Sequence, residues 1–309
     1  MKLLRTLVGL SVFLLLAMGA VPAQAYDLPA VNLGFTSFLD GGPPSGPGLY
    51  FSEYIQYYTS DDFVDTPFEG EDLDVWISLT QFIYQSDKAL LAGGKMGLDV
   101  IVPVVSIDAS YTGFGPEDNG TGLGDILIGP YLQWDPIMGP KGPRFMQRVE
   151  FQFILPTGEY DQNKELNPGS NFFSFDPYWA GTLFITPHWT ASTRIHYLWN
   201  AKNDDPNRFS GAIDDTQAGQ AVHLNFATAY EIIPQKLRIG INGYYLKQTT
   251  DFQVDGTDQG GREEVLGIGP GLLWHINKDA HLFFNTYFES MAENRPEGTR
   301  LNLRLVYHF

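Results

Sequence analysis

The sequence of 309 residues contains no cysteine. This absence excludes disulfide bonds, thiolate metal sites, cysteine nucleophiles and a lipidated cysteine anchor. Basic residues are also few, because 19 lysines and arginines stand against 36 aspartates and glutamates, for a formal net charge of −17. Contacts to nucleic-acid phosphates need clustered basic side chains, so we expect no nucleic-acid partner.

Catalytic and cofactor motifs are missing as well. The chain has no GxSxG, HExxH or P-loop pattern, and the glycine-rich stretch at residues 267–271 lacks the third glycine and the following helix of a dinucleotide site. We therefore expect no cofactor, no metal ligands and no catalytic residues.

The first 25 residues have the pattern of a secretory signal peptide. Lys2 and Arg5 precede a mostly apolar run at residues 6–20, and AQA at residues 23–25 supplies a small-x-small cleavage pattern. The run is shorter than the ~20 apolar residues of a membrane-spanning helix. We expect export and cleavage after residue 25, and no later stretch is apolar for long enough to form a helical anchor.

What the chain does have is alternation of apolar and polar side chains. Near the C-terminus, Leu301, Leu303 and Leu305 alternate with Asn302 and Arg304. Side chains on a strand point to opposite faces, so a period of two predicts strands with one apolar face. About twelve such segments occur, near residues 49–58, 73–84, 96–108, 121–134, 145–155, 171–185, 188–199, 218–232, 235–249, 263–276, 279–289 and 299–309.

Two folds use this alternation. A soluble sandwich buries the apolar faces in its core, whereas a membrane barrel turns them toward lipid. Barrel strands need about 9–11 residues to cross the bilayer, and sandwich strands are commonly about 5–6 residues long. The longer segments favour an all-β fold, a transmembrane antiparallel up-and-down β-barrel of about 12 strands over residues 49–309. The sandwich stays open as the alternative.

The connections between the segments support the barrel. Short links at residues 185–188, 232–235 and 276–279 alternate with long acidic ones, as in outer-membrane barrels. The links at residues 85–95 and 135–144 are longer than turns, so the register of the first five strands is the least defined. The acidic loops suggest a solvated outer face, bridged by divalent ions to lipopolysaccharide or holding a specific ion site.

Aromatic residues lie toward strand ends, as they do in interfacial girdles; examples are Trp134, Trp189 and Trp274. The terminal Phe309 resembles the C-terminal signal that the barrel-assembly machinery recognises. We therefore expect this machinery as a partner and the outer membrane of a Gram-negative bacterium as the location.

The polar faces carry charges of both signs. Because an unpaired buried charge is costly, these charges should be paired, either as filling of the lumen or as a constriction that screens solutes. The candidates for such a constriction are Asp99, Asp125, Arg148, Glu150, Arg194, His196, His223, Arg238, Glu289 and Arg304. Asp125 also fits a purely structural role.

Residues 26–48 do not read as a regular strand, because their second half is rich in glycine and proline. We expect this segment either to enter the lumen as a small plug or to pack at the rim as an extension. Its plug candidates are Phe35, Phe38, Leu39 and Asp40.

Five stretches carry a family resemblance: LGFTSFLDG at residues 33–41, GLGD at 122–125, LPTGEYD at 155–161, FDP at 175–177 and YLWN at 197–200. In this order they resemble the outer-membrane family labelled "MetA-pathway of phenol degradation". The resemblance covers about residues 29–309. It implies a β-barrel transporter or channel for small, often aromatic or hydrophobic solutes, without defined catalytic residues.

The sequence thus favours a passive outer-membrane channel with a narrow lumen. A non-conducting structural or adhesive barrel is the first alternative. An outer-membrane lipid-modifying enzyme is the second, and it would need a Ser–His pair, for which Ser192 and His196 are the nearest candidates.

Overall fold

The computed structural model describes residues 28–29, 31–42, 46–65, 72–111, 114–164, 166–207 and 213–309. The predicted signal peptide at residues 1–25 lies outside these ranges. In the described part of the chain, no helix is long and apolar enough to cross a membrane.

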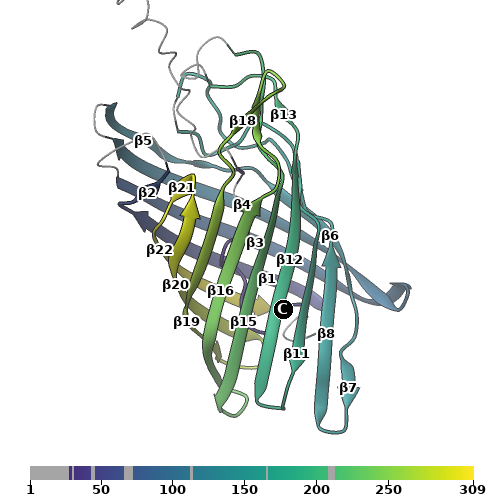
Figure 1. The fold of residues 1–309 in the computed structure, drawn as a ribbon. Helices are drawn as coiled ribbons and strands as arrows, with labels where there is room; N and C mark the ends of the chain where they lie inside the picture. The colour runs from purple at the N-terminus through teal and green to yellow at the C-terminus, as the bar shows by residue number, and fades with distance from the viewer. Residues whose placement is uncertain are drawn as a thin grey trace, which may run out of the picture.

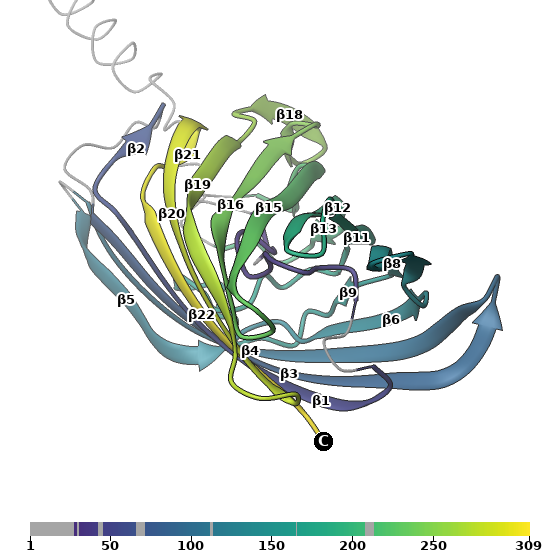
Figure 2. The ribbon, with the colours of Figure 1, turned by 90° about the horizontal axis from the view of Figure 1, so that it is seen from below.

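Twelve antiparallel strands form a closed ring (Figures 1 and 2). In ring order they are β1 (Gly48–Ser60), β3 (Asp72–Leu91), β4 (Gly94–Tyr111), β6 (Leu127–Gln133), β8 (Gly142–Glu150), β11 (Tyr178–Phe184), β12 (Trp189–Asn200), β15 (Ala221–Ile233), β16 (Leu237–Gln248), β19 (Glu264–His275), β20 (Ala280–Glu293) and β22 (Thr299–His308). Pairing of β1 with β22 and of β6 with β8 completes the ring. The predicted barrel is confirmed, and the sandwich alternative is wrong.

The alternation of side chains explains the closed shape. On β22, Leu301, Leu303 and Leu305 are exposed on the outer face, while Arg300 and Asn302 are buried on the inner face. The same division recurs on β16, where Ile239 and Ile241 are exposed and Asn242 is buried. An apolar exterior of this kind suits lipid, and closure gives each of the twelve ring strands a neighbour on both sides.

The two ends of the barrel differ. Short turns join the strands at the lower end of Figure 1, as predicted. At the upper end the long connections add small strands. Four of them form a separate sheet: β13 (Lys202–Asn203), β14 (Thr216–Gln217), β17 (Phe252–Val254) and β18 (Thr257–Gly260). A further pair joins β2 (Phe63–Val64) to β21 (Arg295–Pro296).

Several predicted strand bounds are wrong. The hairpin of β3 and β4 continues to Leu91 and Gly94, so the predicted link at residues 85–95 is mostly strand. The link at residues 135–144 contains β7 (Ile137–Gly139), which pairs back on β8. The predicted strands near residues 121–134, 145–155 and 171–185 are interrupted, and the additional pieces are β5 (Phe114–Leu123), β9 (Phe153–Ile154) and β10 (Ser174–Phe175).

One interruption has a clear cause in the sequence. Pro177 separates β10 from β11, and proline has no N–H to donate to a neighbouring strand. The alignment with β12 nevertheless stays in register across this break, since Phe175 faces Trp199 and Tyr178 faces His196. The same alternate positions therefore point into the barrel before and after the break.

The N-terminal segment, residues 28–42, runs inside the barrel along its length (Figure 2). Leu33 packs with Leu198 and Val265, near the strand ends that carry the long connections. Phe38 packs with Ala229 and Leu273, near the ends that carry the short turns. The chain therefore passes through the lumen before it enters β1 at the short-turn end.

Candidate functional site: the filled lumen

Polar side chains of the wall bind the backbone of the N-terminal segment. Asn302 donates to the carbonyl oxygen of Gly34 at 3.1 Å, and the hydroxyl of Tyr287 donates to the same oxygen at 2.8 Å. The Gly34 amide donates to Asn225 Oδ1 at 2.8 Å, and Gln133 donates to the Gly41 carbonyl at 2.8 Å. These bonds satisfy backbone groups that have no strand partner, as burial requires.

Two glycines allow the segment to lie this close to the wall. Gly34 has φ +78, and a Cβ atom there would lie 2.6 Å from Cε2 of Tyr287. Gly41 has φ +87, and a Cβ atom there would lie 2.7 Å from the Ala180 carbonyl oxygen. Both the left-handed backbone and the missing side chain are needed at these positions.

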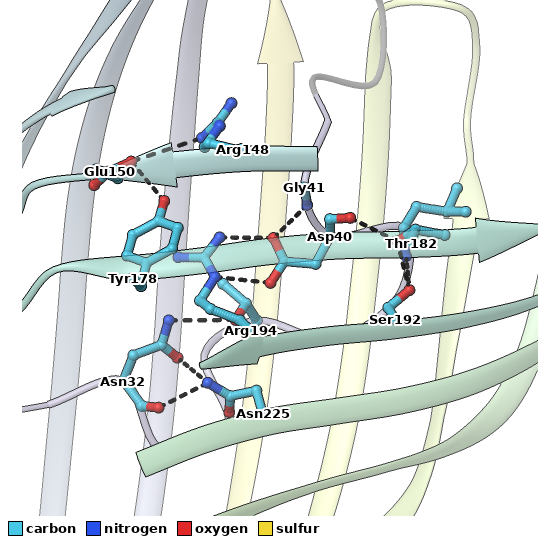
Figure 3. A network of polar contacts seen from close by, with 12 residues as sticks. Asn32, Asp40, Gly41, Arg148, Glu150, Tyr178, Thr182, Ser192, Arg194 and Asn225 are labelled. Atoms are coloured by element: carbon cyan, nitrogen blue, oxygen red, sulfur yellow. Dashed lines mark hydrogen bonds and ion pairs between the residues drawn. The ribbon is translucent and has the colours of Figure 1, made fainter. Parts of the chain in front are cut away.

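Asp40 anchors the segment by charge (Figure 3). Its carboxylate accepts two hydrogen bonds from Arg194, at 2.8 Å from Nε and 2.7 Å from Nη2. Next to it, Thr182 donates to the Asp40 carbonyl at 2.6 Å, and the Leu39 amide donates to Ser192 Oγ at 3.1 Å. A bidentate pair of arginine and carboxylate fixes geometry as well as supplying energy.

Around this pair lies a network of charges at the middle of the lumen, which we call the central network. It comprises Asp40, Asp99, Arg148, Glu150, Arg194 and Arg304, three carboxylates and three arginines. Arg148 Nη1 lies 3.9 Å from Glu150 Oε2, and Tyr178 donates to that same carboxylate at 2.5 Å (Figure 3). Glu150 is 0% exposed and Asp99 3% exposed, so the middle of the lumen is packed with side chains.

Aromatic rings line the central network. Arg148 lies over the ring of Tyr131 and Arg194 over that of Tyr178, each at 4.0 Å from the centroid. Arg304 lies 4.9 Å from the centroid of Tyr54. Such stacking stabilises a guanidinium away from water.

The two phenylalanines of the N-terminal segment occupy aromatic environments in the wall. Phe35 meets Tyr54 edge to face, with 5.8 Å between ring centroids. Phe38 packs in a cluster that includes Tyr131 and Phe283. Each is nearly fully buried, so the lumen offers two sites that hold an aromatic ring.

The two predicted lumen histidines lie together above the central network. His196 on β12 directly faces His223 on β15, and their rings stack with 4.1 Å between centroids. The Asp176 carboxylate bridges the two stacked rings, with one oxygen 2.9 Å from His196 Nδ1 and the other 3.1 Å from His223 Nε2. All three side chains are buried.

Three other candidates belong to different surroundings. Glu289, toward the long loops, accepts hydrogen bonds from Tyr58 at 2.8 Å and Tyr244 at 2.6 Å. Arg238 bonds Glu231 at 3.3 Å near a short turn. Asp125 accepts from the backbone amides of residues 158 and 170, at 2.9 and 2.8 Å, so it ties loop segments together and makes none of the central contacts.

Ser192 and His196, the nearest candidates for a catalytic Ser–His pair, do not contact each other. Ser192 Oγ contacts Thr182 Oγ1 at 2.8 Å, while His196 bonds Asp176. The two residues lie four positions apart on one strand, which separates them by about 13 Å along it.

Some important residues were not predicted. Asp176 and Tyr178 lie on either side of Pro177. Both fall within the single strand that the sequence predicts near residues 171–185. Gln81 joins Tyr54 to Asp99 by hydrogen bonds of 2.9 and 2.7 Å. The signal for Gln81 and Tyr178 was available, because they are polar residues on inward positions of alternating strands. Asp176 lies in the break between β10 and β11, where the alternation is disturbed by Pro177.

A closed antiparallel ring with an apolar exterior and a polar, occupied interior defines a β-barrel of the outer-membrane type. The family model described as "Putative MetA-pathway of phenol degradation" matches residues 55–305, and the chain belongs to this family. No curated protein matches the sequence.

Solved structures share the fold. The COG4313 outer membrane channel from Pseudomonas putida F1 is similar with a TM-score of 0.76 and 18% identity, over 91% of this chain and 100% of that chain. The transport unit of the autotransporter AIDA-I from Escherichia coli is similar with a TM-score of 0.52 and 10% identity, over 85% of this chain and 90% of that chain. At these identities the likeness concerns the fold.

Proposed function

We propose that the protein is a passive outer-membrane channel for small aromatic or hydrophobic solutes, closed at rest by its N-terminal segment. Among the described residues, the segment that fills the lumen contacts the wall through hydrogen bonds, the Asp40–Arg194 ion pair and packing. Because that segment is not a strand of the wall, it can shift without opening the ring. Before a solute can pass, the hydrogen bonds that hold Asp40 and Gly34 to the wall must break.

The solute class follows from what the segment occupies. Phe35 and Phe38 fill two ring-binding sites, and an aromatic solute of similar size can take their place once the segment moves. The arginines beside these sites offer cation–π contacts to such a ring. The family's description, which refers to phenol degradation, points to the same class.

We further propose that the chain is exported and assembled in the outer membrane. Residues 1–25 direct export, and cleavage leaves a mature chain that the barrel-assembly machinery inserts by way of Phe309, which is 75% exposed at the end of β22. The acidic loops at the long-connection end then face lipopolysaccharide. Removal of Phe309 should slow insertion measurably in a reconstituted assembly assay, and an unchanged rate would argue against this role.

Conductance of the mature protein in planar bilayers tests the channel itself. We expect discrete openings whose mean current falls when phenol or benzyl alcohol is added, and cyclohexanol, which lacks the π face, should block more weakly. Heat-modifiable migration in gel electrophoresis confirms that the protein studied is a folded barrel. If all three solutes reduced the current equally, the protein would be a channel, but the proposed preference for aromatic solutes would be wrong.

A non-conducting barrel is the second candidate, and the burial of the central network favours it. It predicts no measurable conductance in planar bilayers, both for the full mature chain and for a chain without residues 28–42. A channel that is closed by its plug predicts rare or small openings for the full mature chain and larger, stable currents for the shortened chain.

A further inference from the structure

We propose that Asp176, His196 and His223 form a binding site for a divalent transition-metal ion such as Zn²⁺, with one nitrogen from each imidazole and one carboxylate oxygen as ligands. The three ligand atoms lie within 4.8 Å of one another. Imidazole and carboxylate are the ligands by which proteins commonly bind zinc, and three of them leave a fourth position for water.

The separations fit a common metal ion. Ligand atoms at about 2.1 Å from a tetrahedral ion lie about 3.4 Å apart. The two carboxylate oxygens of Asp176 lie 2.9 Å from His196 Nδ1 and 3.1 Å from His223 Nε2. Because the three ligand atoms lie within 4.8 Å of one another, shifts of about 1 Å or less for each ligand bring them to tetrahedral spacing. The stacked rings come from neighbouring strands in direct register, which keeps both on the same side of the carboxylate.

Charge is the second reason. The Asp176 carboxylate is 1% exposed, and in the described part of the chain its ion-pair partners are the two histidines alone, with no lysine or arginine. The nearby Arg194 is committed to Asp40. A carboxylate buried at membrane depth needs a positive partner, and a metal ion held by two neutral imidazoles supplies it.

The protonation of the two imidazoles is compatible with the ion. His196 Nε2 and His223 Nδ1, the ring nitrogens that face away from Asp176, are buried and have no hydrogen-bond partner among the residues that the structure describes. When the metal binds the nitrogens that face Asp176, each neutral ring carries its single proton on the far nitrogen, so no net proton is released. The far nitrogens are not ligands and do not themselves argue for the ion.

Binding is tested on the full mature barrel in detergent, freed of metal with EDTA and dialysed. Titration calorimetry with ZnCl₂ should show one saturable ion per barrel, and MgCl₂, which prefers oxygen ligands, should show none. X-ray absorption of the zinc form should show two imidazoles in the first shell. No saturable zinc binding, or a shell of oxygen ligands only, would overturn the proposal.

Variants assign the site. His196→Gln, His223→Gln and Asp176→Asn each remove a direct ligand and should weaken zinc binding by more than the roughly 10–100-fold that loss of a residue supporting a ligand costs. His281→Gln is the matched control, because His281 is also buried and bonds another histidine, His275, at 2.8 Å, without an aspartate between them. Binding that is lost in His281→Gln and kept in the other three would place the ion elsewhere and refute the assignment. Heat-modifiable migration identifies variants that fold, and the absorption measurement on the unaltered protein does not depend on them.

Discussion

At the scale of single residues, the Asp40–Arg194 pair decides where the N-terminal segment sits. Replacing a buried ion pair by apolar residues is often neutral for stability, whereas removing one partner is costly because the other charge is left alone. The pair therefore fixes the position of the N-terminal segment more than it stabilises the barrel, and it contributes to the net charge of the lumen. Without Asp40, the central network keeps three arginines and two carboxylates.

Asp40→Asn should consequently open the channel and favour anions. The substitution leaves Arg194 without its carboxylate, which costs about 3–5 kcal/mol of segment binding. We expect larger or more frequent openings in planar bilayers and a reversal potential shifted toward that of chloride. Asp135→Asn, whose carboxylate pairs with Lys95 at the exposed rim, is the control and should leave both unchanged. Equal currents for Asp40→Asn and the unaltered protein would contradict the anchoring role.

Gly34→Ala tests the close contact with Tyr287. Gly93, in the turn between β3 and β4, has nearly the same φ, +77 against +78, but open space around its Cβ position. Alanine at either site meets the backbone cost of about 1–2 kcal/mol. Only Gly34→Ala also meets the Tyr287 ring, so only this variant should raise the bilayer conductance. A similar rise with Gly93→Ala would attribute the effect to general loss of stability.

The residues that line the lumen were largely predictable, because inward positions alternate along each strand. Arg148, Glu150 and Arg194 were expected there for that reason. Their partners were not, since Asp40 and Arg194 lie 154 positions apart and a single sequence carries no signal for that pairing. Asp176 was not predicted because Pro177 interrupts the alternation of apolar and polar residues next to it.

At the scale of strands and loops, the burial of side chains agrees with the faces predicted from the alternation. The observed ends of the strands differ from the predicted ends. Alternation reports which way a side chain points, whereas the end of a strand depends on hairpin pairing with its neighbour. The β3–β4 hairpin therefore extends beyond its apolar stretch to Leu91. Prolines and glycines explain breaks such as the one at Pro177, but not how far the pairing resumes beyond them.

Ile241→Arg tests the assignment of the outer face. Ile241 is 56% exposed near the middle of β16, where a charge would face the hydrocarbon core. We expect the free energy of unfolding, measured by urea titration in lipid vesicles, to fall by about 2–4 kcal/mol. Thr257→Arg, in the exposed loop strand β18, should change it by less than about 0.5 kcal/mol. Equal effects of both substitutions would contradict a lipid-facing Ile241.

The loops at the long-connection end should respond to pH through Glu263. Burial raises the pKa of this carboxyl to about 7, although Arg295, at 3.2 Å, acts to lower it. A raised pKa means that the folded protein holds this proton more tightly than the unfolded chain, so Glu263 destabilises the fold as pH rises from about 4.5 to 7. Glu263→Gln should flatten the pH dependence of the unfolding midpoint in that window, and an unchanged slope would show that Glu263 does not titrate there.

At the scale of the whole molecule, the barrel and its contents are made by two different kinds of sequence. The wall comes from a repeated period of two, which the sequence shows clearly. The N-terminal segment has no period and takes its shape from the wall through Asn225, Tyr287 and Asn302. Its entry into the lumen was therefore one of two open possibilities, and its direction, from the long loops to the short turns, could not be read from the sequence.

Removing the N-terminal segment tests whether it closes the channel. Single-channel conductance is measured in planar bilayers for the mature chain and for the same chain without residues 28–42, each shown to be a heat-modifiable barrel. We predict that the shortened barrel conducts through a stable, wider pore that aromatic solutes block, while the full chain opens rarely or with smaller steps. Equal conductance of the two chains would contradict the account, because the segment would then not govern the path through the lumen.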